Sequence, residues 1–527
     1  MFSLAIIIGL LGNLIFLLGL SGFLFNKPFI YLSLLFLIIL FYLFFKNYTN
    51  SRLAKDIAGF GKKEKLVACL VFIQIIINLV GALGPELGFD SLWYHLTLPK
   101  LYASWHQIRF VPGWLLYYSA LPKLTEMFYL VAVILSNELL AKLIHFTFGI
   151  LILFPLYELS RKYLNKFLSL LAVLLFYTNL VVGWMSITAY IDLSRTYFEI
   201  MSFLSFVLYL DGKKIRYLIF SAIILGFAAS AKLIAIGSMV IYLGIIGYVN
   251  LFVTKDFRKM FLDSIIFVII SIGTLLPWLL YSYINTGNPV YPLFAGYPIQ
   301  FSLPDLISPI NIIKDMLLIF TNSPDPIHPV YLIAMPLILS LYRGFSTNKK
   351  ILTVYFVISL TVWYFTPRTG GGRFLLPYLP VYSLLVMMAV ADIKNKFIKF
   401  FLISSVFFLT TLSIAYRSFA NLKFLPVILG RQTKSEFLSK NLRFHFGDFY
   451  DIDGYFTKTI KKDDKVLIYG IHNLYYVDFP FIHESYLNKN EQFNYILVGE
   501  GKLPEKYSKW RLVYKNDVSK VKLYVPR

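Results

Sequence analysis

The chain has 527 residues, of which 58% are apolar and only 15% are charged, and its formal net charge is +22. Soluble domains carry about 25% charged residues, and a soluble chain of this length would form several domains that each need a charged surface. The composition therefore excludes a soluble enzyme, a disordered chain and a disulfide scaffold, and it indicates a protein that crosses a membrane many times.

The excess of basic residues would suggest nucleic-acid binding in a soluble protein. In a membrane protein, however, Lys and Arg mark the cytoplasmic loops. We therefore expect the lipid bilayer, and no nucleic acid, as a partner. The single cysteine, Cys69, lies in an apolar run and leaves no internal disulfide to form.

Apolar runs separated by polar segments predict about thirteen transmembrane helices. Several of these runs have only about 15 residues, which is short for a hydrocarbon core of about 30 Å, so these helices extend into their flanks or re-enter the membrane. The predicted spans are Ser3–Phe23, Phe29–Phe45, Leu66–Gly84, Leu139–Tyr157, Phe167–Ile187, Thr196–Leu210, Tyr217–Ala231, Leu233–Val253, Met260–Tyr283, Pro329–Tyr342, Ile351–Phe365, Phe374–Ala391 and Phe397–Tyr416.

Basic residues are concentrated in every second loop between these runs, for example in the loops that hold Lys62–Lys63 and Lys213–Lys214. The positive-inside rule assigns these loops to the cytoplasm, so with thirteen spans the N-terminus is inside and the C-terminus is outside. Nothing basic precedes Ser3, and we expect no cleaved signal peptide. The prediction is a multi-pass protein of the cell (plasma or inner) membrane.

Three segments on the outer side are long enough to carry chemistry: Pro85–Asn137, Ser282–His328 and the tail after Tyr416. In the tail, charged residues become frequent and the apolar runs shrink to strand length. We expect a small α/β domain on the outer face. The predicted strands are Lys465–Tyr469, Tyr495–Val498, Arg511–Tyr514 and Lys520–Val525.

The first candidate site is the run Gly88–Leu96, which follows the third span and contains Asp90, Trp93, Tyr94 and His95. If the run is helical, Asp90 and Tyr94 share a face. A carboxylate beside aromatic rings suits a sugar site, because it can accept a hydroxyl proton while the rings cover a sugar face. The alternative is a helix N-cap followed by an interfacial aromatic belt. His95 could bind a phosphate or a metal, although a lone loop histidine usually binds neither.

Three more ionisable residues lie at predicted outer ends of spans, where charges are costly. Asp192 lies in the turn before the sixth span, Lys232 separates two apolar runs, and Arg373 follows a glycine run beginning at Gly370. Backbone amides and a guanidinium together can clamp a phosphate. The alternatives are a helix cap for Asp192, a snorkelling side chain for Lys232 and a flexible turn at Arg373.

No nucleotide-phosphate loop, metal-ligand string or Ser-His-Asp spacing is present in the sequence. We therefore assign no metal ligand, expect no certain cofactor, and leave a requirement for a divalent cation open.

Five segments occur in an order that resembles the GT-C superfamily of membrane glycosyltransferases, which includes protein O-mannosyltransferases and the lipid A aminoarabinose transferases. They are GFDSLWYHLTLPKLY, AYIDL, SAKL, PWLLYSYINTGNPVYPLF and GGGRFLLPYLP. The resemblance implies a mainly α, polytopic fold. It divides the chain into two extra N-terminal helices with a basic cytoplasmic loop (1–65), a transmembrane catalytic core (66–416) and an external soluble α/β domain (417–527).

The resemblance also implies an activity. Such enzymes transfer a sugar from a polyprenyl-phosphate carrier to an acceptor hydroxyl at the outer face, usually with inversion. Asp90 takes the place of the general base, Lys232 and Arg373 match basic residues near the lipid phosphate, and Asp192 matches a second acidic position. Trp93, Tyr94 and His95 flank the base and are the remaining candidates for substrate contact. The acceptor is a glycan, a lipid or a protein.

Two other functions remain open on the sequence alone. A transporter or flippase of lipid-linked saccharides needs ionisable residues in mid-span, and Lys142 and Glu199 are such residues. A non-catalytic membrane scaffold that binds a partner through its tail would not need Asp90.

Overall fold

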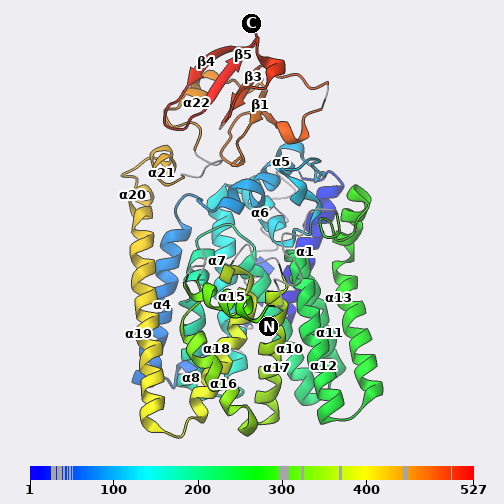
Figure 1. Ribbon diagram of the computed structural model, residues 1–527, viewed down its shortest axis with the longest axis vertical. Helices are drawn as coiled ribbons and strands as arrows, with labels where there is room; N and C mark the ends of the chain where they lie inside the picture. The colour runs from blue at the N-terminus through cyan, green and yellow to red at the C-terminus, as the bar shows by residue number, and fades with distance from the viewer. Residues whose placement is uncertain are drawn as a thin grey trace.

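The computed structural model describes residues 1–24, eight single positions between 31 and 49, and then 51–295, 308–321, 326–366, 371–442, 449–488, 490–499 and 501–527. Within these ranges the fold is a bundle of long apolar helices capped at one end by a small sheet (Figure 1). Among the described residues, six helical segments are long and apolar enough to cross a bilayer: Phe2–Leu20, Lys62–Ala82, Glu138–Ser160, Leu233–Val253, Phe257–Thr286 and Lys396–Ile428.

The bundle confirms a polytopic, mainly α protein, but not the number of thirteen spans. Further helices in the bundle are shorter or more polar than those six. They are α6 (Leu124–Leu135), α8 (Lys166–Tyr177), α10 (Asp192–Gly212), α11 (Ile215–Ala231), α16 (Val330–Leu341), α17 (Thr347–Tyr364) and α18 (Leu379–Asp392). The second predicted span, Phe29–Phe45, falls mostly outside the described residues.

Two predicted spans differ from the helices that form. The run Phe167–Ile187 is broken into α8 and α9 (Leu180–Met185). The break is at Asn179, whose side-chain amide donates to the carbonyls of Leu175 and Phe176 and to the Tyr331 hydroxyl. The sixth span begins at Asp192, four residues earlier than predicted, because its first two turns are polar yet buried.

The core of the bundle is the packing of α10 against α11 and α7 (Glu138–Ser160), with α13 (Phe257–Thr286) against α11. The N-terminal helix α1 (Phe2–Leu20) packs on α6 and α11, and Phe16 stacks on Trp278 of α13 at 3.8 Å. Opposite these, α4 (Lys62–Ala82) lies beside α19 (Lys396–Asn421) and α8 (Figure 1).

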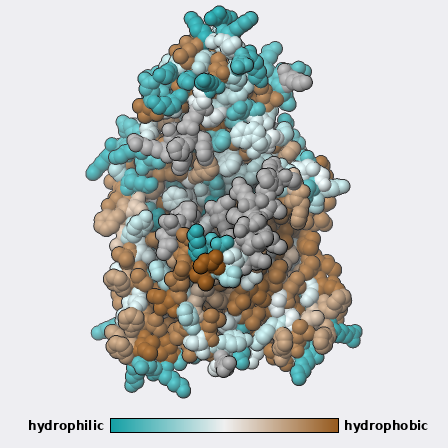
Figure 2. Space-filling model, in the orientation of Figure 1, coloured by the Kyte–Doolittle hydropathy of each residue, from teal (hydrophilic) through white to brown (hydrophobic). Residues whose placement is uncertain are grey.

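On the face shown in Figure 2, hydrophobic residues form a broad band over the lower part of the molecule, and hydrophilic residues gather at its lower rim and over the sheet. The connections from α12 (Gly237–Tyr248) to α13 and from α18 to α19 lie at that lower rim (Figure 1). They carry Lys255 and Lys394, and Arg258 and Lys396 lie in the first turns of the helices that follow. This distribution is the one expected of a multi-pass membrane protein with basic loops on one side.

The end of the bundle nearest the sheet, which corresponds to the predicted outer side and is called the outer end from here on, is covered by short elements and by the tail. The π-turn Ser91–His95 and α5 (Thr97–Trp105) follow α4, and α6 returns the chain to α7. The tail begins with α20 (Leu425–Ile428), α21 (Lys434–Asn441) and α22 (Tyr455–Thr459) and ends in the sheet at the top of Figure 1.

The sheet has five strands in the order β2-β1-β3-β5-β4. Strands β1 (Val466–Tyr469), β3 (Tyr495–Val498), β4 (Arg511–Lys515) and β5 (Lys522–Val525) agree with the four predicted apolar runs. The short strand β2 (Phe481–His483) was not predicted. Strand β1 pairs in parallel with β2 and β3, and β5 pairs antiparallel with β3 and β4, so the sheet is mixed.

Candidate active site

Four of the predicted site residues, which come from four separate segments, form one ionic cluster at the outer end of the bundle. Arg373 donates from Nη1 to Asp90 Oδ2 at 2.7 Å, and its Nε lies 4.0 Å from Asp192 Oδ2. Lys232 Nζ donates to Asp192 Oδ1 at 2.6 Å. Two carboxylates and two cations therefore alternate as Asp90, Arg373, Asp192 and Lys232; we call this set the rim cluster.

The backbone explains why these residues meet. Helices α10 and α11 are antiparallel neighbours, so the first residue of α10, Asp192, lies beside Lys232, which ends α11. Asp90 precedes the π-turn that follows α4, and its backbone N–H donates to the Tyr190 hydroxyl at 3.2 Å. Arg373 lies in the 3-10 turn Gly371–Phe374 that leads into α18. The first residues of the predicted glycine motif, Thr369 and Gly370, lie outside the described residues.

The rim cluster is largely buried, but three of its four side chains are partly exposed to solvent. Asp192 is 1% exposed, whereas the side chains of Asp90 and Arg373 are each 15% exposed and that of Lys232 is 18% exposed. Burial lowers the pKa of Lys232 to about 8, and the neighbouring Asp192 carboxylate opposes this shift. The Asp192 carboxylate at 2.6 Å from Lys232 Nζ favours the cationic form, in a site where water screens charge poorly.

Hydrogen bonding within the cluster is incomplete. Among the described residues, neither Arg373 Nε nor Asp192 Oδ2 has a hydrogen-bond partner, although both are buried. The Arg373 guanidinium also lies over the Tyr190 ring at 5.0 Å, and Lys232 Nζ lies over the Phe374 ring at 4.7 Å. The aromatic faces hold the two cations in place. Arg373 Nε is then a donor that a ligand oxygen could use.

A buried carboxylate, Glu86, joins the two loops that carry Asp90 and Asp192. Its Oε1 accepts from the backbone N–H of Leu87 at 2.9 Å and from that of Gly88, and its Oε2 accepts from the N–H of Ala189 at 2.6 Å. Burial raises the pKa of Glu86, while the nearby Lys142 lowers it. The sequence analysis missed Glu86. Its one signal was position, four residues before Asp90 in the same outer loop.

Two residues of α7 form hydrogen bonds with the backbone of the same loops. Lys142 donates to the carbonyls of Gly84 and Pro85. His145 Nε2 accepts from the Leu193 N–H at 3.0 Å, so its Nδ1 carries the proton and donates to the Thr188 carbonyl at 2.8 Å. Lys142, which the sequence analysis gave as a mid-span residue, thus lies about one turn into α7 and fixes backbone carbonyls, and His145 fixes the turn that ends in Asp192.

The predicted substrate residues around Asp90 lie in different surroundings. The Tyr94 ring stacks on the Tyr118 ring at 3.8 Å between centroids. Trp93 donates from Nε1 to the Leu115 carbonyl at 3.0 Å and stacks on His472 of the tail. His95 is 3% exposed and pairs with Glu126 at 2.8 Å. Among the described residues, none of the three has a hydrogen bond or ion pair to the rim cluster. The Tyr94 hydroxyl nevertheless lies near it: burial and then the Asp90 carboxylate raise the pKa of Tyr94, and Arg373 opposes this rise.

The described residues include no group of three or more His, Cys, Asp and Glu side chains placed to hold a metal ion. The two carboxylates of the rim cluster already pair with Arg373 and Lys232. A divalent cation at Asp90 would therefore have to compete with the Arg373 guanidinium.

The fold is similar to that of ArnT from Cupriavidus metallidurans. The ArnT structure bound to undecaprenyl phosphate matches with a TM-score of 0.58 at 11% identity, over 87% of this chain and 98% of that one. The apo ArnT structure matches with a TM-score of 0.61 at 12% identity, over 87% of this chain and 97% of that one. The match confirms the fold that the resemblance to the GT-C superfamily predicted. No protein-family model matches the sequence, and a search of curated proteins finds no match.

Proposed function

We propose that this chain of GT-C fold is a glycosyltransferase that takes a sugar from a polyprenyl-phosphate donor and transfers it, with inversion, to an acceptor hydroxyl. The observation that carries the proposal is the rim cluster, in which two cations and two carboxylates from distant segments converge with unfilled hydrogen-bonding capacity. The shared fold adds support, because ArnT binds undecaprenyl phosphate.

Arg373 and Lys232 are the proposed ligands of the donor phosphate. When the bond between the sugar and the phosphate breaks, the lipid phosphate gains negative charge, and fixed cations in a poorly screened site stabilise it. Arg373 offers a planar fork for two phosphate oxygens. Lys232 adds a compact charge that Asp192 holds in place.

Asp90 is the proposed general base. It accepts the proton of the acceptor hydroxyl while that oxygen attacks the anomeric carbon, and the lipid phosphate leaves from the opposite side of the sugar ring. In the structure the Asp90 carboxylate accepts a hydrogen bond from Arg373. A donor phosphate that draws the guanidinium toward itself frees Asp90 for the acceptor, so donor binding would prepare the base.

Asp192 has a supporting role in this proposal. It is buried, it contacts both cations, and the His145-fixed turn holds it. It would keep Lys232 and Arg373 oriented before the donor arrives. The chemistry would take place on the outer side of the cell membrane, with the C-terminal sheet extracytoplasmic and the loops of Lys62 and Lys213 in the cytoplasm.

The test is donor cleavage by the purified chain in detergent. An enzyme releases polyprenyl phosphate from a polyprenyl-phosphate sugar when an acceptor extract is added, and mass spectrometry detects both products. A transporter or a scaffold leaves the donor intact, because no bilayer separates two compartments. Comparing lipid-linked sugars and surface glycans of cells with and without the gene then identifies the sugar and the acceptor.

A further inference from the structure

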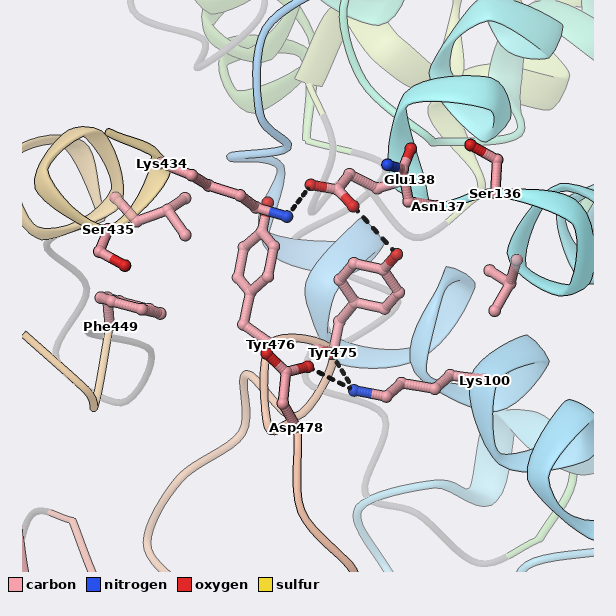
Figure 3. A pocket seen from close by; sticks show the side chains of 12 residues that line it. Lys100, Ser136, Asn137, Glu138, Lys434, Ser435, Phe449, Tyr475, Tyr476 and Asp478 are labelled. Carbon is pink, nitrogen blue, oxygen red and sulfur yellow. Dashed lines mark hydrogen bonds and ion pairs between the residues drawn. The ribbon is translucent and has the colours of Figure 1, made fainter. Parts of the chain in front are cut away.

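A polar pocket, separate from the rim cluster, lies between the tail and the outer ends of α6 and α7 (Figure 3). Its volume is about 330 Å³, near the lower end of the range of about 300–1,000 Å³ for small-molecule sites. None of its lining residues belongs to the rim cluster. The lining that matters for its chemistry is Lys100, Glu138, Lys434, Tyr475, Tyr476 and Asp478.

The charges that line this pocket are paired and balanced. Lys434 forms an ion pair with Glu138, whose Oε2 also accepts from the Tyr475 hydroxyl at 3.2 Å. Lys100 lies 3.3 Å from Asp478 (Figure 3). Two cations balanced by two carboxylates do not favour a phosphate or another strongly charged ligand. They offer donors and acceptors that suit a neutral ligand with many hydroxyl groups.

Aromatic rings supply the other half of such a site. Tyr475, Tyr476 and Phe449 line the pocket, and Lys434 Nζ lies over the Tyr476 ring at 4.7 Å. Flat rings cover the C–H faces of a sugar, while carboxylates and ammonium groups hydrogen-bond its hydroxyls. This combination is the chemistry that recognises a carbohydrate.

The tyrosine wall is fixed in place before any ligand binds. Lys100 donates to the carbonyls of Tyr475 and Val477 at 2.7 and 2.6 Å. A wall held in this way loses little conformational freedom on binding. The pocket is also reached from solvent, since the Asp478 side chain is 84% exposed and that of Lys434 is 47% exposed.

The same wall touches the loop that carries Asp90. The Tyr475 backbone N–H donates to the Leu92 carbonyl at 3.3 Å, and the Tyr476 hydroxyl donates to the Glu86 carbonyl at 2.9 Å. Leu92 and Glu86 lie two residues after and four residues before Asp90. The tyrosine wall of the pocket is therefore anchored to the loop that carries the proposed base.

We propose that this pocket binds a neutral saccharide unit of the acceptor, so that the acceptor is a glycan held at one unit while another unit presents its hydroxyl to Asp90. The inference rests on the proposed glycosyltransferase function for its second part. The first part, that the pocket binds a saccharide, rests on the geometry of the pocket alone.

The test measures saccharide binding by the full-length chain in detergent, without donor. The probes are fluorescent disaccharides of glucose, galactose, mannose and N-acetylglucosamine. Ser435→Trp places an indole into the pocket and leaves the ion pairs untouched, and it should weaken binding at least about tenfold. Ser439→Trp, one turn later on α21, is the matched control and should bind as the wild type does. Absence of binding of every probe to the wild type, or equal affinity in Ser435→Trp, overturns the proposal.

A second pair of variants keeps the test independent of folding. Lys434→Ala removes one partner of Glu138 and should weaken binding, whereas Lys440→Ala on the same helix should not. Asp90→Asn separates this proposal from the proposed function, because saccharide binding should persist when turnover is lost. Pocket-dependent binding with full turnover in Asp90→Asn would reject the base and keep the pocket. Loss of turnover without any probe binding would reject the pocket alone.

Discussion

Helix α10 carries two ionic clusters that differ in how completely they are paired. At its outer end, Asp192 belongs to the rim cluster. One turn deeper, Arg195 donates to Glu199 at 2.8 Å, and both side chains are 2% exposed. Ser238 donates to Glu199 at 2.9 Å, and Arg195 also donates to the Tyr378 hydroxyl at 3.2 Å.

The deep pair lies within one helix at i and i+4 and leaves no buried side-chain atom without a partner, whereas Arg373 Nε and Asp192 Oδ2 have none among the described residues. Burial of charge is therefore not what marks the site in this protein. A closed network stabilises a fold or specifies its packing, whereas a cluster with spare hydrogen-bonding capacity is suited to a ligand. The deep pair also gives no support to a transport pathway, because its charges are bound to each other.

The largest effect is expected for Asp90→Asn, and it distinguishes a catalytic Asp90 from one that only caps a helix. Asp90→Asn keeps the shape of the side chain but cannot accept a proton, and loss of a general base costs about 10²–10⁴-fold in turnover. Asp256→Asn is the matched control, because Asp256 is an N-cap that accepts from the Lys259 N–H at the opposite end of the bundle. Turnover of purified enzyme at matched detergent stability is the readout, and near wild-type turnover in Asp90→Asn would reject the catalytic assignment.

The deep pair should respond in stability. Glu199→Gln leaves the Arg195 charge buried without its counter-charge, which costs about 3–5 kcal/mol. Denaturant titration in mixed micelles measures the loss. The double variant Arg195→Met/Glu199→Leu should recover most of the stability and retain turnover, because a buried pair can be replaced by apolar residues. A stable but inactive double variant would move the deep pair into the functional site.

Arg373→Ala should weaken binding of the polyprenyl-phosphate donor. A charge-assisted contact is worth about 1.5–3 kcal/mol, so the dissociation constant should rise about tenfold or more. Arg373→Lys should recover only part of this loss, since the planar fork is gone. Equilibrium binding of a labelled donor checks both variants, and unchanged affinity in Arg373→Ala would remove this residue from the site. Lys232→Ala is a parallel test with the same expected direction.

Asp192→Asn should have the smallest effect on chemistry. The amide oxygen can still accept from Lys232, so the contact is weakened and not removed, and only part of the roughly 1.5–3 kcal/mol of a charge-assisted contact is lost. The turnover number should therefore fall less than about tenfold. A loss as large as that in Asp90→Asn would make Asp192 the better candidate for the base.

The sequence predicted most of the helices, the four strands of regular length and the four residues of the rim cluster. Apolar runs, and ionisable residues placed where a membrane makes charge costly, can each be recognised from a short stretch of sequence, and the folded protein keeps both features. The sequence did not predict Glu86 as the link between the loops of Gly88 and Ala189, or His145 as the support of the Asp192 turn. These roles depend on how helices pack side by side, which one sequence does not encode in its spacing. The break at Asn179 was missed for a related reason, since the run that contains it has no charged residue and its other polar residues are only Ser169, Thr178 and Ser186 beside the Tyr177 hydroxyl.

The most direct measurement is the affinity of Asp90→Asn for undecaprenyl phosphate, compared with the wild type in the same detergent. In the structure the Arg373 guanidinium donates a hydrogen bond to the Asp90 carboxylate. If Arg373 binds the lipid phosphate and Asp90 performs the chemistry, removing the carboxylate charge leaves affinity equal or increases it while turnover collapses. A loss of affinity in Asp90→Asn would contradict the account, because it would mean that Asp90 supports the donor site and is not the base that donor binding releases.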